Sequence, residues 1–221
     1  IELARWFHRH HALSLTTIFL MSWSAHVASL HQHDGLAWRL SSACERLLKS
    51  MRSVPPDKQA GVMWQLFLVR SGCRAREADR FRNHEYWVDA SRSLNEASQL
   101  LRRAEQAAQV FSGSRALSKR IGNELRRAEI LWIAHLMRSD GHPARAFTDE
   151  VHRFTRLIAA IADLLEDAAS TDFDEGDLEI FRGRLDLLRA AYEDWIQSED
   201  ESTGGQVIAV PEQSAEAPRP T

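Results

Sequence analysis

The sequence predicts an all-α protein: an antiparallel helical bundle of six to seven helices with heptad-like seams and a disordered C-terminal tail. Three observations lead to this prediction. Apolar residues recur at three- and four-residue steps along most of the chain. No alternating run of Val, Ile and Thr is bounded by the turns of a β-hairpin. Hydrophobic residues make up 44% of the 221 residues, which is enough to bury a core.

The first expected helix includes residues 12–30, which hold no Asp, Glu, Lys or Arg. On a helical wheel the large apolar residues fall on one side and the hydroxyl residues mostly on the other. A hydroxyl face permits close packing, so a helix inside the bundle is the first interpretation. Two alternatives stay open. The stretch is close to the shortest that spans a bilayer, and residues 1–33, with Arg5 and Arg9 before an apolar run, resemble an export signal.

Two amphipathic helices are expected next. The first carries an apolar stripe at helical spacing after a turn at 34–35: Leu36, Leu40, Ala43, Leu47 and Met51. It ends at two consecutive prolines, because proline has no N–H and restricts the residue before it. Asp57 is placed to cap the second helix, which continues through Leu66 and Val69.

The most regular pattern lies in residues 87–111. Eight residues there step alternately by three and four: Trp87, Ala90, Leu94, Ala97, Leu101, Ala104, Ala108 and Phe111. The alanines let a neighbouring helix approach closely. We therefore take Trp87, Leu94, Leu101 and Phe111 as candidate interaction residues, which would drive self-association if the fold leaves them uncovered.

Three further helices and a tail complete the prediction. The first ends in ILWIAHLM, which is apolar on nearly all sides and predicts burial all round. Heptad patterns in 147–168 and 178–195 flank a polar turn and predict an antiparallel hairpin. From Ser198 the chain becomes acidic and contains several Gly and Pro residues. The predicted division is a bundle domain at 1–197 and a disordered tail at 198–221.

Residues that could carry chemistry are few. His8 and His11 share a helix face and are weak metal candidates, but no usual zinc motif accompanies them. Cys44 and Cys73 are expected to be small apolar core residues, or one disulfide if the protein is exported. There is no GxSxG nucleophile motif and no Gly-rich phosphate loop. The sequence therefore favours a protein that is not an enzyme and has no cofactor, although an active site assembled from distant helices need not show in the sequence.

Charge is unevenly distributed, although the net charge is only −3. Residues 70–127 hold 13 basic and seven acidic side chains, whereas residues 140–201 hold six basic and 17 acidic ones. Five arginines close to aromatic residues are candidates for nucleic-acid contact: Arg70, Arg74, Arg76, Arg80 and Arg82. Acidic residues are interleaved with them at spacings of three and four, which favours ion pairs on the helix surface instead.

These observations favour a non-enzymatic interaction or regulatory protein that binds a protein partner, or a second copy of itself, through helix faces. One alternative is a nucleic-acid-associated regulator that uses residues 70–127. The other is a membrane-anchored or exported accessory protein of a secretion or conjugation type of system, with residues 12–30 as the membrane contact. A cytoplasmic location is expected, with the inner membrane or export as alternatives. The 25 Arg against three Lys suggest a GC-rich bacterial genome.

Overall fold

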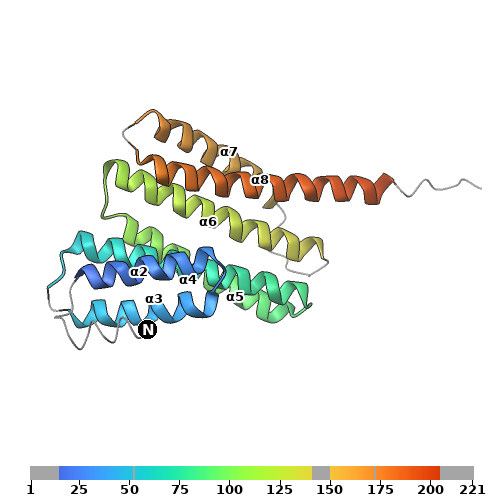
Figure 1. The fold of residues 1–221 in the computed structure, drawn as a ribbon. Helices are drawn as coiled ribbons and strands as arrows, with labels where there is room; N and C mark the ends of the chain where they lie inside the picture. The colour runs from blue at the N-terminus through green and yellow to red at the C-terminus, as the bar shows by residue number, and fades with distance from the viewer. Residues whose placement is uncertain (1–14, 52, 141–149, 172, 205–221) are drawn as a thin grey trace, which may run out of the picture.

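A computed structural model describes residues 15–51, 53–140, 150–171 and 173–204. Within these residues there are seven helices and no strand, which confirms the all-α bundle. The helices are α2 (Leu15–Leu30), α3 (Asp34–Ser50), α4 (Pro56–Asn83), α5 (Trp87–Ala108), α6 (Gly113–Ser139), α7 (Glu150–Ala169) and α8 (Glu175–Gly204). Short connections place successive helices antiparallel to one another (Figure 1).

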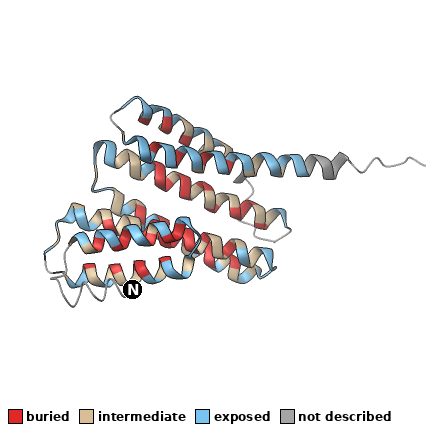
Figure 2. Ribbon diagram, in the orientation of Figure 1, coloured by how far each residue is buried: buried red, intermediate tan, exposed pale blue. Residues whose placement is uncertain are grey.

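The helices form two groups that meet along α6. Helices α2 to α5 pack on one another in the first group, and α6, α7 and α8 in the second (Figure 1). Helix α6 belongs to both, because it also packs on α4 and α5. Figure 2 shows buried residues along this central helix and on the facing sides of its neighbours. Residues 130–137 of α6 include no exposed side chain, so the predicted burial all round is observed.

The heptad seam of α5 is an internal contact. Leu94 and Leu101 are only 7% and 5% exposed, and they pack against apolar residues of α4 and α6. The Ser71 hydroxyl of α4 donates a hydrogen bond of 2.8 Å to the Ala97 carbonyl, which shows how closely these two helices approach. The fold therefore covers the middle of the seam, and only residues at its two ends are half-buried: Trp87, Ala108 and Phe111.

The α7–α8 hairpin follows the predicted heptad pattern. Ile161 and Leu165 of α7 are buried in one cluster with Leu185 and Leu188 of α8. Helix α8 continues to Gly204 and so includes the first seven residues, 198–204, of the predicted disordered tail. This segment contains no Gly or Pro before Gly204, so nothing in it stops a helix. Residues 205–221 of the predicted tail, and the start of the pattern at 147, lie outside the described residues.

The buried face of α3 is rotated from the stripe that the sequence predicts. Its buried residues are Ala37, Leu40, Ser41, Cys44 and Leu48, whereas Leu36 is exposed. The polar Ser41 is accepted in the core because its hydroxyl receives a 3.0 Å hydrogen bond from Nε of Arg70. Cys44 and Cys73 are both buried free thiols, so their predicted role as small core residues agrees with the structure.

A glycine allows α4 and α6 to pack around a buried arginine. A Cβ atom at Gly72 would lie 2.5 Å from Nη2 of Arg126, and that side chain is buried and ion-paired with Glu129. Gly183 of α8 is also helical, but a Cβ atom there would meet nothing within 4 Å. The two glycines therefore form a matched pair, one in a close contact and one in open space.

We predict opposite effects of alanine at these two glycines. Gly72→Ala should lower the free energy of unfolding by about 1–3 kcal/mol, because the methyl group displaces the Arg126 guanidinium. Gly183→Ala should raise it by about 0.5–1 kcal/mol, because alanine loses less conformational freedom in a helix. Urea unfolding followed by circular dichroism measures both effects. Equal stabilisation by the two substitutions would contradict the close contact at Gly72.

Candidate functional site

Helix α2 buries its small face and exposes its large apolar one. Its buried residues are Ile18, Met21, Ser22, Ala25, Ala28 and Ser29. Its exposed residues include five large hydrophobic ones: Phe19, Leu20, Trp23, Val27 and Leu30. Sequence reasoning identified the two faces but not which of them turns outward. None of the described helices combines the length and the apolar character needed to cross a membrane.

The small face of α2 fits α4 through short polar contacts. The Ser22 hydroxyl lies 3.0 Å from Oε1 of Gln65, and the Ser29 hydroxyl accepts a 2.8 Å hydrogen bond from Nη2 of Arg76. Between these contacts, Ala25 packs in a cluster that includes Cys73. Small side chains let the two helix backbones come close together. This packing leaves five large side chains of α2 on the outside, while Ile18 and Met21 are buried together with the small residues.

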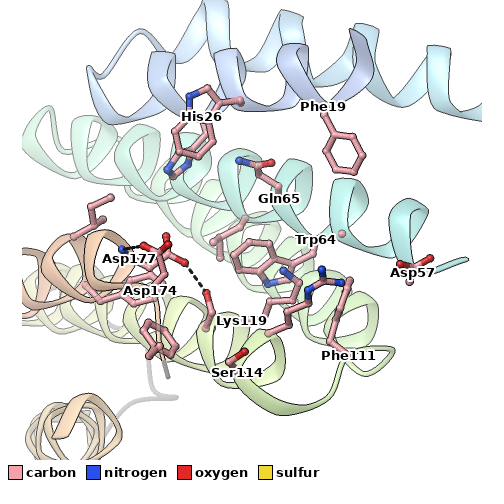
Figure 3. A pocket seen from close by; sticks show the side chains of 18 of the residues that line it. Phe19, His26, Asp57, Trp64, Gln65, Phe111, Ser114, Lys119, Asp174 and Asp177 are labelled. Atoms are coloured by element: carbon pink, nitrogen blue, oxygen red, sulfur yellow. Dashed lines mark hydrogen bonds between the residues drawn. The ribbon is translucent and has the colours of Figure 1, made fainter. Parts of the chain in front are cut away.

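The apolar face of α2 forms one wall of a pocket between the two helix groups. The pocket has a volume of about 490 Å³ and is lined by residues of α2, α4, α6 and the start of α8 (Figure 3). Aromatic rings lie on several sides, among them Phe19, Trp23, Trp64, Phe111 and Phe173. Mostly apolar pockets of this size, with a few polar groups, are typical of small-molecule sites.

Lys119 of α6 lies among these aromatic rings. Its ammonium nitrogen is 4.2 Å from the centre of the Trp64 ring and 4.5 Å from that of Phe111. Trp64 is itself fixed in place, because its indole N–H donates a 3.0 Å hydrogen bond to Oδ1 of Asn123. Burial lowers the pKa of Lys119, and the nearby Asp177 offsets part of this effect. The rings stabilise the ammonium group through cation–π contacts.

Carboxylates at the pocket rim are occupied by contacts that cap α8. Oδ1 of Asp174 accepts a 3.0 Å hydrogen bond from the backbone N–H of Asp177, in the first turn of the helix. Oδ2 of Asp177 accepts a bond of 3.3 Å from the Ser118 hydroxyl of α6. Negative groups at this position stabilise the positive end of the helix dipole. The acidic turn thus acts as a helix cap.

A group of three charged residues lies next to the pocket. The Glu129 carboxylate of α6 pairs with Arg126 of the same helix and, at 2.6 Å, with Arg184 of α8. Burial lowers the pKa of Arg126 to about 10, although the neighbouring Glu129 carboxylate opposes part of this shift. His26 of α2 lines the same pocket, and its pKa is lowered to about 4 by burial and then by the charges of Arg184 and Arg126. His26 is therefore neutral at neutral pH.

The five candidate arginines of the nucleic-acid hypothesis all contact carboxylates. The pairs are Arg70–Glu45 (2.7 Å), Arg74–Glu96 (2.8 Å), Arg74–Glu77, Arg76–Asp34 (2.6 Å), Arg80–Asp34 (3.1 Å), Arg82–Asp79 (2.9 Å) and Arg82–Asp140 (2.7 Å). The Arg74 guanidinium also lies 4.6 Å from the centre of the Trp38 ring. The arginines join α3, α4 and α5, and they are not arranged as a row of unpaired cations.

The remaining candidates do not form a chemical site. His8 and His11 lie outside the described residues, and the described part of the chain holds no group of three or more His, Cys, Asp or Glu placed to bind a metal ion. Burial raises the pKa of Cys44 to about 12 and also raises that of Cys73, which disfavours the reactive thiolate. No family model, curated protein or solved structure matches the chain.

The lowered pKa of His26 predicts a pH-dependent stability. The unfolded chain takes up a proton at His26 below about pH 6.5, whereas the folded chain does so only near pH 4. Stability should therefore fall as the pH drops through this window, by about 2 kcal/mol between pH 7.5 and pH 5. His26→Gln should remove most of this difference, measured by urea unfolding at the two pH values. An unchanged pH dependence in the variant would contradict the assignment.

Proposed function

We propose that this protein acts by protein–protein contact, through the exposed apolar face of α2, and that a second copy of the chain occupies this face. The observation that carries the proposal is the orientation of α2. Leu20 and Trp23 are 58% and 55% exposed, while serine and alanine residues of the same helix are buried. Contiguous exposed apolar residues are typical of interaction sites.

A second copy is the favoured occupant because α2 carries no charge. In a two-fold symmetric contact each helix meets its own counterpart, so charged residues near the axis would oppose like charges. Residues 15–30 contain no Asp, Glu, Lys or Arg, and the sole titratable side chain among them, His26, is neutral at neutral pH. Two copies of α2 can therefore pack together without electrostatic repulsion.

The structure also changes which surface supports the interaction hypothesis. The heptad seam of α5 is used within the molecule, since Leu94 and Leu101 are buried there. The ion pairs of the Arg-rich segment give the nucleic-acid alternative less support, because phosphates would have to displace carboxylates already in contact. The membrane-anchored or exported alternative remains a prediction from the sequence.

The test compares the same substitution, leucine to glutamate, at exposed positions on two different helices. Leu20→Glu places a charge on the proposed contact face. Leu187→Glu places the same charge on α8, where the leucine is 73% exposed and does not line the pocket. We expect sedimentation equilibrium to show a dimer for the wild type and for Leu187→Glu. Leu20→Glu should weaken dimerisation at least about 30-fold, since it buries an unpaired carboxylate in the contact.

The outcome is decisive in either direction when folding is checked by circular dichroism. A wild type that is still monomeric at a protein concentration of about 100 μM would overturn the proposal, because a specific dimer should have a dissociation constant below this concentration. So would a dimer that both variants weaken equally, because the contact would then not be at α2.

A further inference from the structure

The pocket between the two helix groups has a chemistry that the dimer contact does not use. It lies between α2, α4, α6 and α8, and its aromatic walls surround a single partly buried lysine, Lys119 (Figure 3). Leu20 and Val27 of the α2 face are not among its lining residues, whereas Phe19, Trp23 and Leu30 belong both to that face and to the pocket. The two sites therefore share residues, and a substitution at Leu20 can disturb the dimer contact without changing the pocket lining.

Some of the charged side chains that line the pocket have an oppositely charged partner within 4.0 Å, and others do not. Arg184 is paired with Glu129, and Lys58 lies 4.0 Å from its neighbour Asp57. The carboxylates of the α8 cap accept hydrogen bonds from the Ser118 hydroxyl and from the backbone. Lys119 and Arg115 are one helical turn apart on α6, and neither forms an ion pair within 4.0 Å with any described residue, although the Asp177 carboxylate lies near enough to offset part of the lowering of the Lys119 pKa. Two neighbouring cations without a direct carboxylate contact attract an anion that can approach them more closely than Asp177 does.

The aromatic rings select the rest of the ligand. Trp64 and Phe111 contact the Lys119 ammonium, while Phe19, Trp23 and Phe173 provide further apolar surface from other elements. A cationic ligand is disfavoured, because Lys119 already occupies the faces of two rings and would repel it. An apolar molecule without charge would leave the two cations without a counter-ion. A volume of about 490 Å³ accommodates a drug-sized molecule.

We propose that this pocket binds a small organic anion, a carboxylate attached to an apolar ring-containing body, with Lys119 as the principal counter-ion and Arg115 at the rim as the second. The rings of Trp64, Phe111 and Phe173 would enclose the apolar part of the ligand. Because Leu20 does not line the pocket, Leu20→Glu should bind the ligand at least as tightly as the wild type does, even where it abolishes the dimer.

The first experiment uses three probes of matched shape: 1-naphthaleneacetate, its neutral primary amide and the cation 1-naphthylethylamine. Isothermal titration calorimetry on the full chain should show one saturable site for the acid. The acid should bind at least about tenfold more tightly than the amide, since a hydrogen-bonded ion pair in a partly buried pocket contributes this much. The cation should bind more weakly than the amide.

Two variants locate the effect at Lys119. Lys119→Met should abolish the preference for acid over amide, so that both bind with similar affinity. Lys49→Met, at an exposed lysine of α3 paired with Glu45, should bind as the wild type does. No saturable binding of the acid to the wild type, equal affinity for acid and amide, or an unchanged preference in Lys119→Met would each overturn the proposal.

A second measurement does not require any variant to fold. The chain contains only three lysines, Lys49, Lys58 and Lys119, so amine acetylation can be followed site by site by mass spectrometry. Bound 1-naphthaleneacetate should slow the acetylation of Lys119 several-fold and leave the rate at Lys49 unchanged. Equal rates at Lys119 with and without the acid would show that the ligand does not reach this lysine, and the proposal would fail.

Discussion

The contact between Glu129 and its two arginines is the constraint on which the arrangement of the two helix groups depends. Arg184 comes from α8, so the Glu129 carboxylate links α6 and α8, and the paired Arg126 fills the space that Gly72 leaves open on α4. Removing charges from water is costly, and this cost is recovered only where the pairs are well made. Burial, and then the positive charges of Arg184 and Arg126, lower the pKa of His26, so this ion-pair group also contributes to the electrostatics of the pocket.

Much of the fold could be predicted because apolar residues spaced three or four positions apart lie on the same face of a helix. This held for α5, where large and small apolar residues alternate along the buried face, and for the α7–α8 hairpin, where the buried residues are mostly large. It failed for α3, because a serine such as Ser41 looks polar in sequence but is buried by a hydrogen bond from another helix. It also left α2 undecided, since two different faces were evident, and the surfaces of α3 and α4 together determine which one packs inward.

The candidate site could be predicted far less well, because it is assembled from four helices that are distant in sequence. No local pattern connects Lys119 with Trp64, which are 55 positions apart, or with the cap of α8. The one available signal was the scarcity of lysine in an arginine-rich chain, which makes Lys119 unusual without indicating its surroundings. Conversely, the arginine cluster attracted attention in the sequence, and its interleaved acids correctly indicated the ion pairs that the structure contains.

The separation of Glu129 and Arg184 by 55 residues has a consequence for synthesis on the ribosome. Helices α2 to α5 pack mainly on sequence neighbours and can assemble as they emerge. Helix α6 cannot complete its contacts at that stage. Its second apolar side, which includes Ile121 and Leu125, is covered by α7 and α8, and these helices have not yet been translated. Translation of the last third of the chain is therefore the interval in which the nascent protein exposes most apolar surface and depends most on chaperones.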